Sequence, residues 1–156
     1  MEAHTPAALR FLHQPDLGLL LLRVALGISG VFHGGQKLFS AFGGKGMEGF
    51  TKFLGSMNVP MPGVSAYMAA LAEFGGGILI AIGLFTRLAS IPFAFTMLVA
   101  WGMAHQFSFI KTETVNGSEL PFHLMVMALA LVFTGPGKYS VQALFFGKRD
   151  AAPHRV

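Results

Sequence analysis

The chain has 156 residues, of which 53% are hydrophobic and 12% charged, and its mean hydropathy is +0.61. Soluble domains carry about 25% charged residues, so this composition argues against a soluble domain and predicts a membrane protein. The net charge of +4 does not indicate a nucleic-acid partner, because the basic residues form no stripe interleaved with surface aromatics. Without cysteine, the chain has no disulfide, thiolate nucleophile, Fe–S ligand or cysteine-based zinc site.

Four apolar stretches approach the length of about 20 residues that a helix needs to cross a bilayer. Pro15 precedes the first stretch, while Pro92 and Pro121 fall in the first turns of the third and fourth, where a missing N–H is tolerated. The fourth stretch is short for a span. The predicted spans are residues 17–38, 64–85, 88–110 and 120–135. The sequence therefore predicts an all-α integral membrane protein, folded as a four-helix bundle.

A fifth, shorter helix is expected between the first two spans. Apolar side chains recur there at helical spacing, with polar side chains between them, which is typical of an interfacial amphipathic helix. The apolar residues are Met47, Phe50, Phe53, Leu54 and Met57. The expected organisation is a cytoplasmic N-terminal segment (1–16), one transmembrane domain (17–147) and a cytoplasmic tail (148–156).

The distribution of basic residues predicts the orientation. Four spans place both termini on one side of the membrane, together with the loop at Arg87. That side carries six bases, whereas the other side carries four bases mixed with acids. The six are Arg10, Arg87, Lys138, Lys148, Arg149 and Arg155, and the four are Lys37, Lys45, Lys52 and Lys111. The positive-inside rule then places both termini in the cytoplasm.

Four ionisable residues within the predicted spans suggest a site. A charge at the centre of a bilayer costs about 2.5–3.5 kcal/mol on insertion scales, so such residues call for a reason. At about 1.5 Å per residue, His33, His105 and His123 all lie roughly 5–8 Å below the outer surface, and Glu73 lies near the middle of the second span. Together they predict an outward-facing pocket within the bundle, in which imidazoles bind a small ligand or exchange protons with it.

Each histidine also has a simpler interpretation, as an interfacial residue bonded to a backbone carbonyl. No metal site is assigned, because no pair has the His-Glu-x-x-His spacing on one helix. Trp101, one turn before His105, either stacks on a planar ligand or belongs to an aromatic belt.

Two basic residues in the first span have open roles. Arg23 either snorkels to the cytoplasmic face or forms a structural ion pair with Glu73. Without that pair, burial favours a protonated Glu73. Lys37 either attracts an anionic head group or substrate, or anchors the helix at the interface. The candidate catalytic residues are therefore Glu73 and His105, and the candidate ligand-binding residues are His33, Lys37, Trp101 and His123.

Three segments resemble the DoxX family of small four-helix membrane proteins from bacteria and archaea. They are RVALGISGVFHGGQKLF, LAEFGGGILIAIGLFTRLAS and LVFTGPGKYSVQALF, and the resemblance covers about residues 17–147. It implies four membrane helices in the inner membrane of a prokaryote. The family is named for a subunit of a thiosulfate:quinone oxidoreductase, so the resemblance also implies a link to quinone. Gln142 departs from the family pattern, which often has an acid after the serine.

The expected function is that of a quinone-linked membrane oxidoreductase component that binds a small redox ligand. Quinone is the expected cofactor, ahead of haem or a metal, and a bound cofactor or a protein partner supplies the electrons. The lipid bilayer and either a protein partner or a second copy of the chain are the expected contacts. The alternatives are a non-catalytic scaffold that recruits a redox or stress enzyme and, less favoured for want of paired broken helices, a small-molecule carrier.

Overall fold

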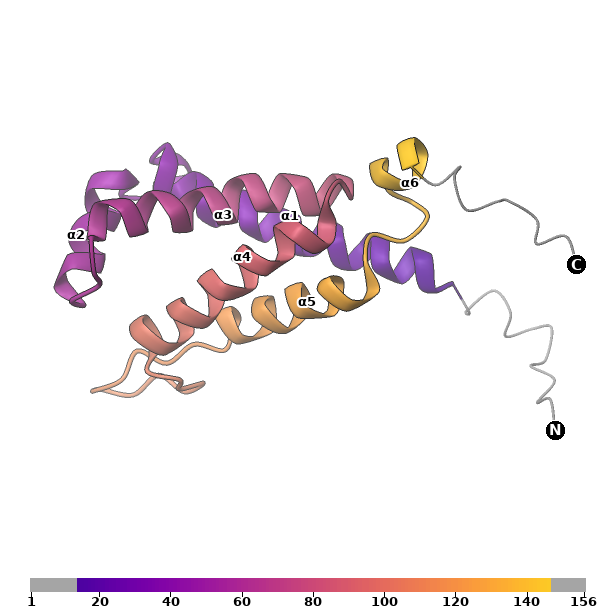
Figure 1. The fold of residues 1–156 in the computed structure, drawn as a ribbon. Coiled ribbons are helices and arrows are strands. Elements are labelled where there is room, and N and C mark those ends of the chain that lie inside the picture. The colour runs from indigo at the N-terminus through magenta and orange to yellow at the C-terminus, as the bar shows by residue number, and fades with distance from the viewer. Residues whose placement is uncertain (1–13, 147–156) are drawn as a thin grey trace, which may run out of the picture.

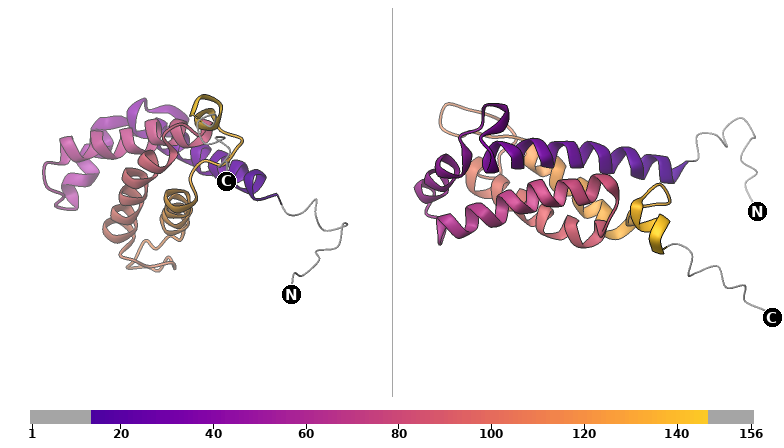
Figure 2. Two further views of the ribbon diagram at one scale, coloured as in Figure 1. Left: turned by 45° about the vertical axis from the view of Figure 1, so that its right-hand side comes forward. Right: turned by 90° about the horizontal axis from the view of Figure 1, so that it is seen from above.

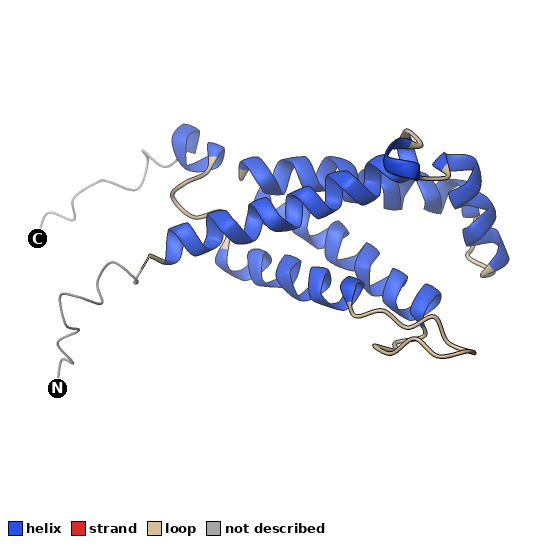
Figure 3. Ribbon diagram, turned by 180° about the vertical axis from the view of Figure 1, so that it is seen from behind, coloured by secondary structure: helices blue, strands red, loops and turns tan. Residues whose placement is uncertain are grey.

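The computed structural model describes residues 14–146, and the regular structure in that range is helical apart from one isolated β-bridge between Lys111 and Asn116 (Figures 1 and 3). Residues 1–13 and 147–156, which hold most of the two expected cytoplasmic segments and four of the bases counted for orientation, lie outside the described residues. The helices are α1 (Pro15–Leu38), α2 (Gly46–Ser56), α3 (Pro62–Ile82), α4 (Thr86–Val99), α5 (Leu120–Thr134) and α6 (Val141–Phe146), with a 3₁₀ turn at Ala41–Gly43 and a π turn at Ala100–Ala104. The all-α prediction is confirmed over the described part of the chain.

Proline and glycine set most of the helix boundaries. Pro15, Pro62 and Pro121 each lie in the first turn of a long helix, where a backbone N–H has no intrahelical acceptor and its loss costs little. Gly83 ends α3 with a φ of 75°, a left-handed conformation that glycine adopts without steric cost. The helix between the first two spans is present as α2.

The third span ends earlier than its composition predicts. The sequence predicts a helix to Ile110, but α4 ends at Val99 and continues only as the π turn through Ala104. Gln106 and Phe107 then adopt φ values of 51° and 55°, a left-handed conformation that cannot continue a right-handed helix. Residues 105–119 consequently form a loop, although they include Phe107, Phe109 and Ile110.

The helices form two antiparallel pairs, α1 with α3 and α4 with α5, and α4 also packs against α3 (Figures 1 and 2). We call the two ends of the molecule the α2 end, which includes the 105–119 loop, and the α6 end, which includes Gly83. The pairs lie close together at the α6 end and diverge toward the α2 end (Figure 1). The α2 helix packs against α3 and α1.

Glycines let α1 and α3 approach closely along their shared length. A Cβ atom added at Gly34 would lie 2.5 Å from the backbone nitrogen of Phe74, and one at Gly30 would lie 2.7 Å from the carbonyl oxygen of Glu73. One at Gly27 would lie 2.7 Å from the carbonyl oxygen of Gly77. Small residues at helix crossings give such close contact in membrane proteins. These contacts fix which residues of α1 lie opposite which residues of α3.

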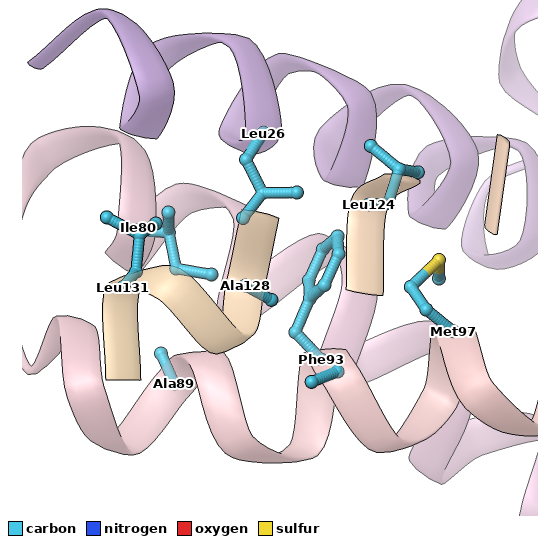
Figure 4. Packing of buried hydrophobic residues seen from close by; sticks show 9 residues of the cluster. Leu26, Ile80, Ala89, Phe93, Met97, Leu124, Ala128 and Leu131 are labelled. Atoms are coloured by element: carbon cyan, nitrogen blue, oxygen red, sulfur yellow. The ribbon is translucent and has the colours of Figure 1, made fainter. Parts of the chain in front are cut away.

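The apolar core lies where the two pairs meet (Figure 4). Phe93 of α4 is fully buried and reaches across to Gly30 of α1 and Gly76 of α3. Leu26, Ile80 and Leu131, from α1, α3 and α5, are also fully buried. All four long helices therefore contribute to one core.

Three helical segments are long and apolar enough to cross a membrane: Pro15–Leu38, Pro62–Ile82 and Thr86–Ala104. The apolar α5 has 15 residues. Large apolar side chains on all four long helices point outward, and Leu21, Leu88, Phe95 and Phe133 are each at least 63% exposed. Such side chains are stable facing lipid. The structure thus supports three of the four predicted spans by length and composition, and the fourth stays a prediction.

Candidate functional site

Arg23 is the buried cation of α1, and it binds the C-terminal segment. Its side chain is fully buried, its Nη1 atom donates a hydrogen bond of 2.8 Å to the carbonyl oxygen of Pro136, and its Nη2 atom donates to that of Tyr139. The guanidinium also lies against Gly83. Arg23 therefore joins α1 to the α3–α4 turn and to the GPGKYS segment at the α6 end. The candidate ion pair between Arg23 and Glu73 is not formed.

Glu73 pairs instead with Lys37. The Lys37 ammonium donates to both carboxylate oxygens, and the Glu73 side chain is 1% exposed while that of Lys37 is 23% exposed. The pair crosses from α1 to α3 on the α2 side of the close glycine contacts. The carboxylate is thus sealed within the protein, and the ammonium lies between it and the surface.

Sequence reasoning missed this partnership, although a usable signal was present. The sequence predicts Arg23 as the candidate partner of Glu73, and for Lys37 it predicts either attraction of an anion or an anchor at the interface. However, Gly27, Gly30 and Gly34 share the spacing of a helix face. Such a face, packed against the glycines after Glu73, fixes the register and places Lys37 one turn beyond it.

Lys37 also lines an open cavity of about 340 Å³ at the α2 end. The walls come from the end of α1, the glycine-rich turn after it, and α2. The lining residues are Gln36, Lys37, Gly43, Gly44, Lys45, Gly46, Gly49, Phe50 and Phe53. The Lys37 ammonium lies 4.8 Å from the ring centroid of Phe50, within cation–π range.

The three candidate histidines lie on three different elements of the α2 end. His33 is half-buried on α1 with its ring edge-on to Phe32, His105 follows the π turn, and His123 is exposed on α5. None of them is among the residues that line the cavity beside Lys37. Among residues 14–146, no group of three His, Asp or Glu side chains is arranged to hold a metal. Their catalytic and ligand-binding roles remain predictions.

His105 and Trp101 belong to a second cluster, on the α4–α5 pair. The Nδ1 atom of His105 lies 2.6 Å from the carbonyl oxygen of Asn116, a hydrogen bond that fixes the ring against the loop. The Trp101 ring packs against three phenylalanines, with centroid distances of 4.8–5.2 Å. They are Phe107, Phe109 and Phe122.

The indole nitrogen of Trp101 is buried, and among the described residues it finds no hydrogen-bond acceptor. Buried donors without a partner are uncommon, and each calls for an explanation such as water or a ligand. Trp101 is also part of the π turn, a local distortion that often marks functional sites. The His123 ring lies 5.8 Å from that of Phe122 and so borders the same cluster.

Comparison with known proteins agrees with the resemblance seen in the sequence. The DoxX family matches residues 18–106. The Bacillus subtilis (strain 168) protein named "Putative oxidoreductase CatD" is 32% identical over 136 residues, which cover 86% of this chain and 92% of that protein. No solved structure matches the chain.

Two Escherichia coli (strain K12) proteins are also similar, the inner membrane proteins YphA and YqjF. They are 28% and 31% identical, and the matches cover 79% and 83% of this chain and 86% and 92% of the relatives. With a family match over more than half of the chain and relatives that align over most of their length, this helical membrane protein belongs to the DoxX family.

Proposed function

We propose that the chain is the membrane component of a quinone-linked oxidoreductase in the inner membrane of a prokaryote, with four spans and both termini in the cytoplasm. Several observations support this proposal. Two relatives are named inner membrane proteins and a third carries an oxidoreductase name. The α5 helix packs antiparallel beside α4, so a membrane crossed by α4 would also be crossed by α5 (Figure 1). Its length of about 22 Å suits a short span with little tilt.

The observation that carries the redox proposal is the buried indole N–H of Trp101, which lacks an acceptor among the described residues. A quinone offers a carbonyl acceptor on a flat ring, and aromatic side chains stack on such rings. In our proposal Trp101 would hold a quinone head group by donating a hydrogen bond from its Nε1 atom to a quinone carbonyl. Phe109 and Phe122, which pack against the indole, would provide aromatic contacts to the same head group.

His105 and His123 lie within this part of the molecule, and an imidazole ring carries nitrogens that can donate and accept a proton. In our proposal these imidazoles would supply protons to the quinone as it is reduced, with the His105 ring held in place by its hydrogen bond to the carbonyl oxygen of Asn116. The electrons come from a protein partner at the membrane surface. Glu73 and Lys37, which bridge α1 and α3, have no direct part in this step.

The content of bound quinone tests the proposal. The full chain, purified in mild detergent, should yield quinone on solvent extraction, identified by mass spectrometry, and a short-chain ubiquinone should quench the fluorescence of Trp101, the only tryptophan. Trp101→Phe keeps an aromatic ring but removes the donor, so bound quinone should fall about 2- to 10-fold, as expected for one hydrogen bond of about 0.5–1.5 kcal/mol.

Phe133→Leu, at a ring that is 79% exposed on α5, is the matched control and should retain the wild-type quinone content. A purified wild-type protein with neither extractable quinone nor quenching would refute the redox proposal. For the orientation, single cysteines at Ser56 and Tyr139 in this cysteine-free chain should be labelled from outside and inside the cell, respectively. Labelling of position 139 from outside would reverse the proposed topology.

A further inference from the structure

The Lys37–Glu73 pair is asymmetric in its access to solvent. Glu73 is sealed at 1% side-chain exposure, whereas Lys37 is 23% exposed and forms part of the cavity wall. The Lys37 ammonium therefore contacts the Glu73 carboxylate on its buried side and borders the cavity on its exposed side. Anything that binds Lys37 from the cavity competes with Glu73 for the same ammonium.

The cavity has the character of a site for a small organic anion. Of the described residues that line it, Lys37 and Lys45 are basic and none is acidic. Gln36 also lines the cavity, with its Nε2 atom donating a hydrogen bond of 3.2 Å to the carbonyl oxygen of Phe42, and Phe50 and Phe53 provide apolar walls. A volume of about 340 Å³ falls within the range of small-molecule sites. An anionic group against the lysines and a ring or short chain against the phenylalanines would match this lining.

Few charges near Glu73 could replace Lys37 as its partner. Arg23 is bound to Pro136 and Tyr139 at the α6 end. Glu48 and Lys52 pair with each other at 2.6 Å on the exposed face of α2, where hydrogen bonding from Lys52 lowers the pKa of Glu48. The titratable and charged groups on α3 and on the elements packed against it are Asp16, Arg23, His33 and Lys37 (α1), Lys45, Glu48 and Lys52 (α2 and the preceding turn), Tyr67 and Glu73 (α3), and Arg87 (α4).

Binding of an anion at Lys37 would leave the Glu73 carboxylate buried without its cation. An unpaired buried charge is costly, and proteins relieve such a cost by neutralising the group. A proton from solvent then takes the place of the ammonium on Glu73. The anion and the proton add together, so the total charge of the site is unchanged.

We propose that the cavity between α1 and α2 binds a small monovalent organic anion with an apolar body, and that each bound anion is accompanied by uptake of one proton at Glu73. Lys37 binds either the Glu73 carboxylate or the anion, and Lys45 provides a second positive charge in the cavity wall that strengthens anion binding. This site is separate from the Trp101 cluster and is independent of the proposed quinone function.

Calorimetric titration of the full chain with benzoate, in nanodiscs of neutral lipid, tests the proposal. Repeating the titration in buffers of different ionisation enthalpy gives the number of protons taken up per benzoate bound. The wild type should take up close to one. Glu73→Gln should bind benzoate more tightly, because the competing carboxylate is gone, and should take up none.

Lys37→Met should weaken benzoate binding about 30-fold or more, the loss typical of truncating one partner of a buried charge pair. If that variant misfolds because Glu73 is left unpaired, the double variant Lys37→Met/Glu73→Gln removes both charges and should fold without binding. Lys52→Met alters a lysine outside the cavity and should match the wild type. Wild-type binding without proton uptake, uptake that persists in Glu73→Gln, or no benzoate binding at all would overturn the proposal.

Discussion

Replacing Arg23 by methionine should release the C-terminal segment from the helix bundle. The guanidinium makes two hydrogen bonds, one of 2.8 Å to the carbonyl oxygen of Pro136 and one to that of Tyr139. Hydrogen bonds to charged groups contribute about 1.5–3 kcal/mol each, so their joint contribution is at most about 3–6 kcal/mol. The Nε atom of Arg23 is buried without a hydrogen-bond partner among the described residues. Removing it relieves a desolvation cost, which offsets part of the free energy lost with the two hydrogen bonds. We expect Arg23→Met to cost about 2–4 kcal/mol.

Arg23→Lys should cost less, about 1.5–3 kcal/mol, because an ammonium reaches one carbonyl where the guanidinium fork reaches two. Unfolding in detergent, followed by tryptophan fluorescence, measures these values. Arg87→Met is the control: this arginine is exposed at the same end of the molecule and makes one hydrogen bond of 3.2 Å, to Phe133. It should cost less than about 1 kcal/mol.

Limited trypsin digestion distinguishes the local effect from a general loss of stability. In Arg23→Met, cleavage after Lys138 should speed up before the rest of the chain becomes susceptible. If Arg23→Met were no more destabilised than Arg87→Met, or if cleavage after Lys138 were unchanged, the proposed role of Arg23 in holding the segment would be refuted.

Two further predictions concern the contact between α1 and α3. Gly34→Ala places a Cβ atom 2.5 Å from the Phe74 nitrogen and should destabilise the protein by about 1–3 kcal/mol. The control is Gly75→Ala, whose Cβ atom meets nothing within 4 Å, so it should be neutral or stabilising by up to about 1 kcal/mol. Equal unfolding midpoints for the two variants would contradict this prediction. Lys37→Met leaves the buried Glu73 carboxylate without a partner and should lower the free energy of unfolding by about 3–5 kcal/mol. Glu73→Gln leaves the Lys37 ammonium, which can reach the surface, and should lower it by less. Chemical unfolding of the two single variants measures the difference between their costs. Equal costs would count against the difference in solvent access between Lys37 and Glu73.

The helices themselves could be predicted from composition and from proline and glycine. The predicted first span, 17–38, starts two residues after α1, because Pro15 is itself the first residue of the helix. The predicted third span, 88–110, is longer than the observed helix because Phe107, Phe109 and Ile110 are as apolar as the residues of a span. Their backbone leaves the helix at Gln106, a change that composition does not record.

The partners of the buried charges could not be predicted in the same way. Periodicity gives the face of a helix on which a residue lies, but a pair depends on the register between two helices. For Glu73 that register comes from the glycine contacts of α1, and it selects Lys37 in place of Arg23. The burial of the Trp101 indole could not be predicted either, because it depends on the loop after α4. That loop takes its path from Gln106 and Phe107, whose backbone is left-handed.

The position of Arg23 has a consequence for the order in which the protein is made. Its two carbonyl acceptors, at Pro136 and Tyr139 between α5 and α6, lie 113 and 116 residues later in the chain, so α1 is synthesised long before its guanidinium can form these two hydrogen bonds. A chain that stops before Pro136 keeps an unsatisfied charge at its first helix. Unfinished chains therefore differ from complete ones by two unmade hydrogen bonds at a charge that the finished fold buries.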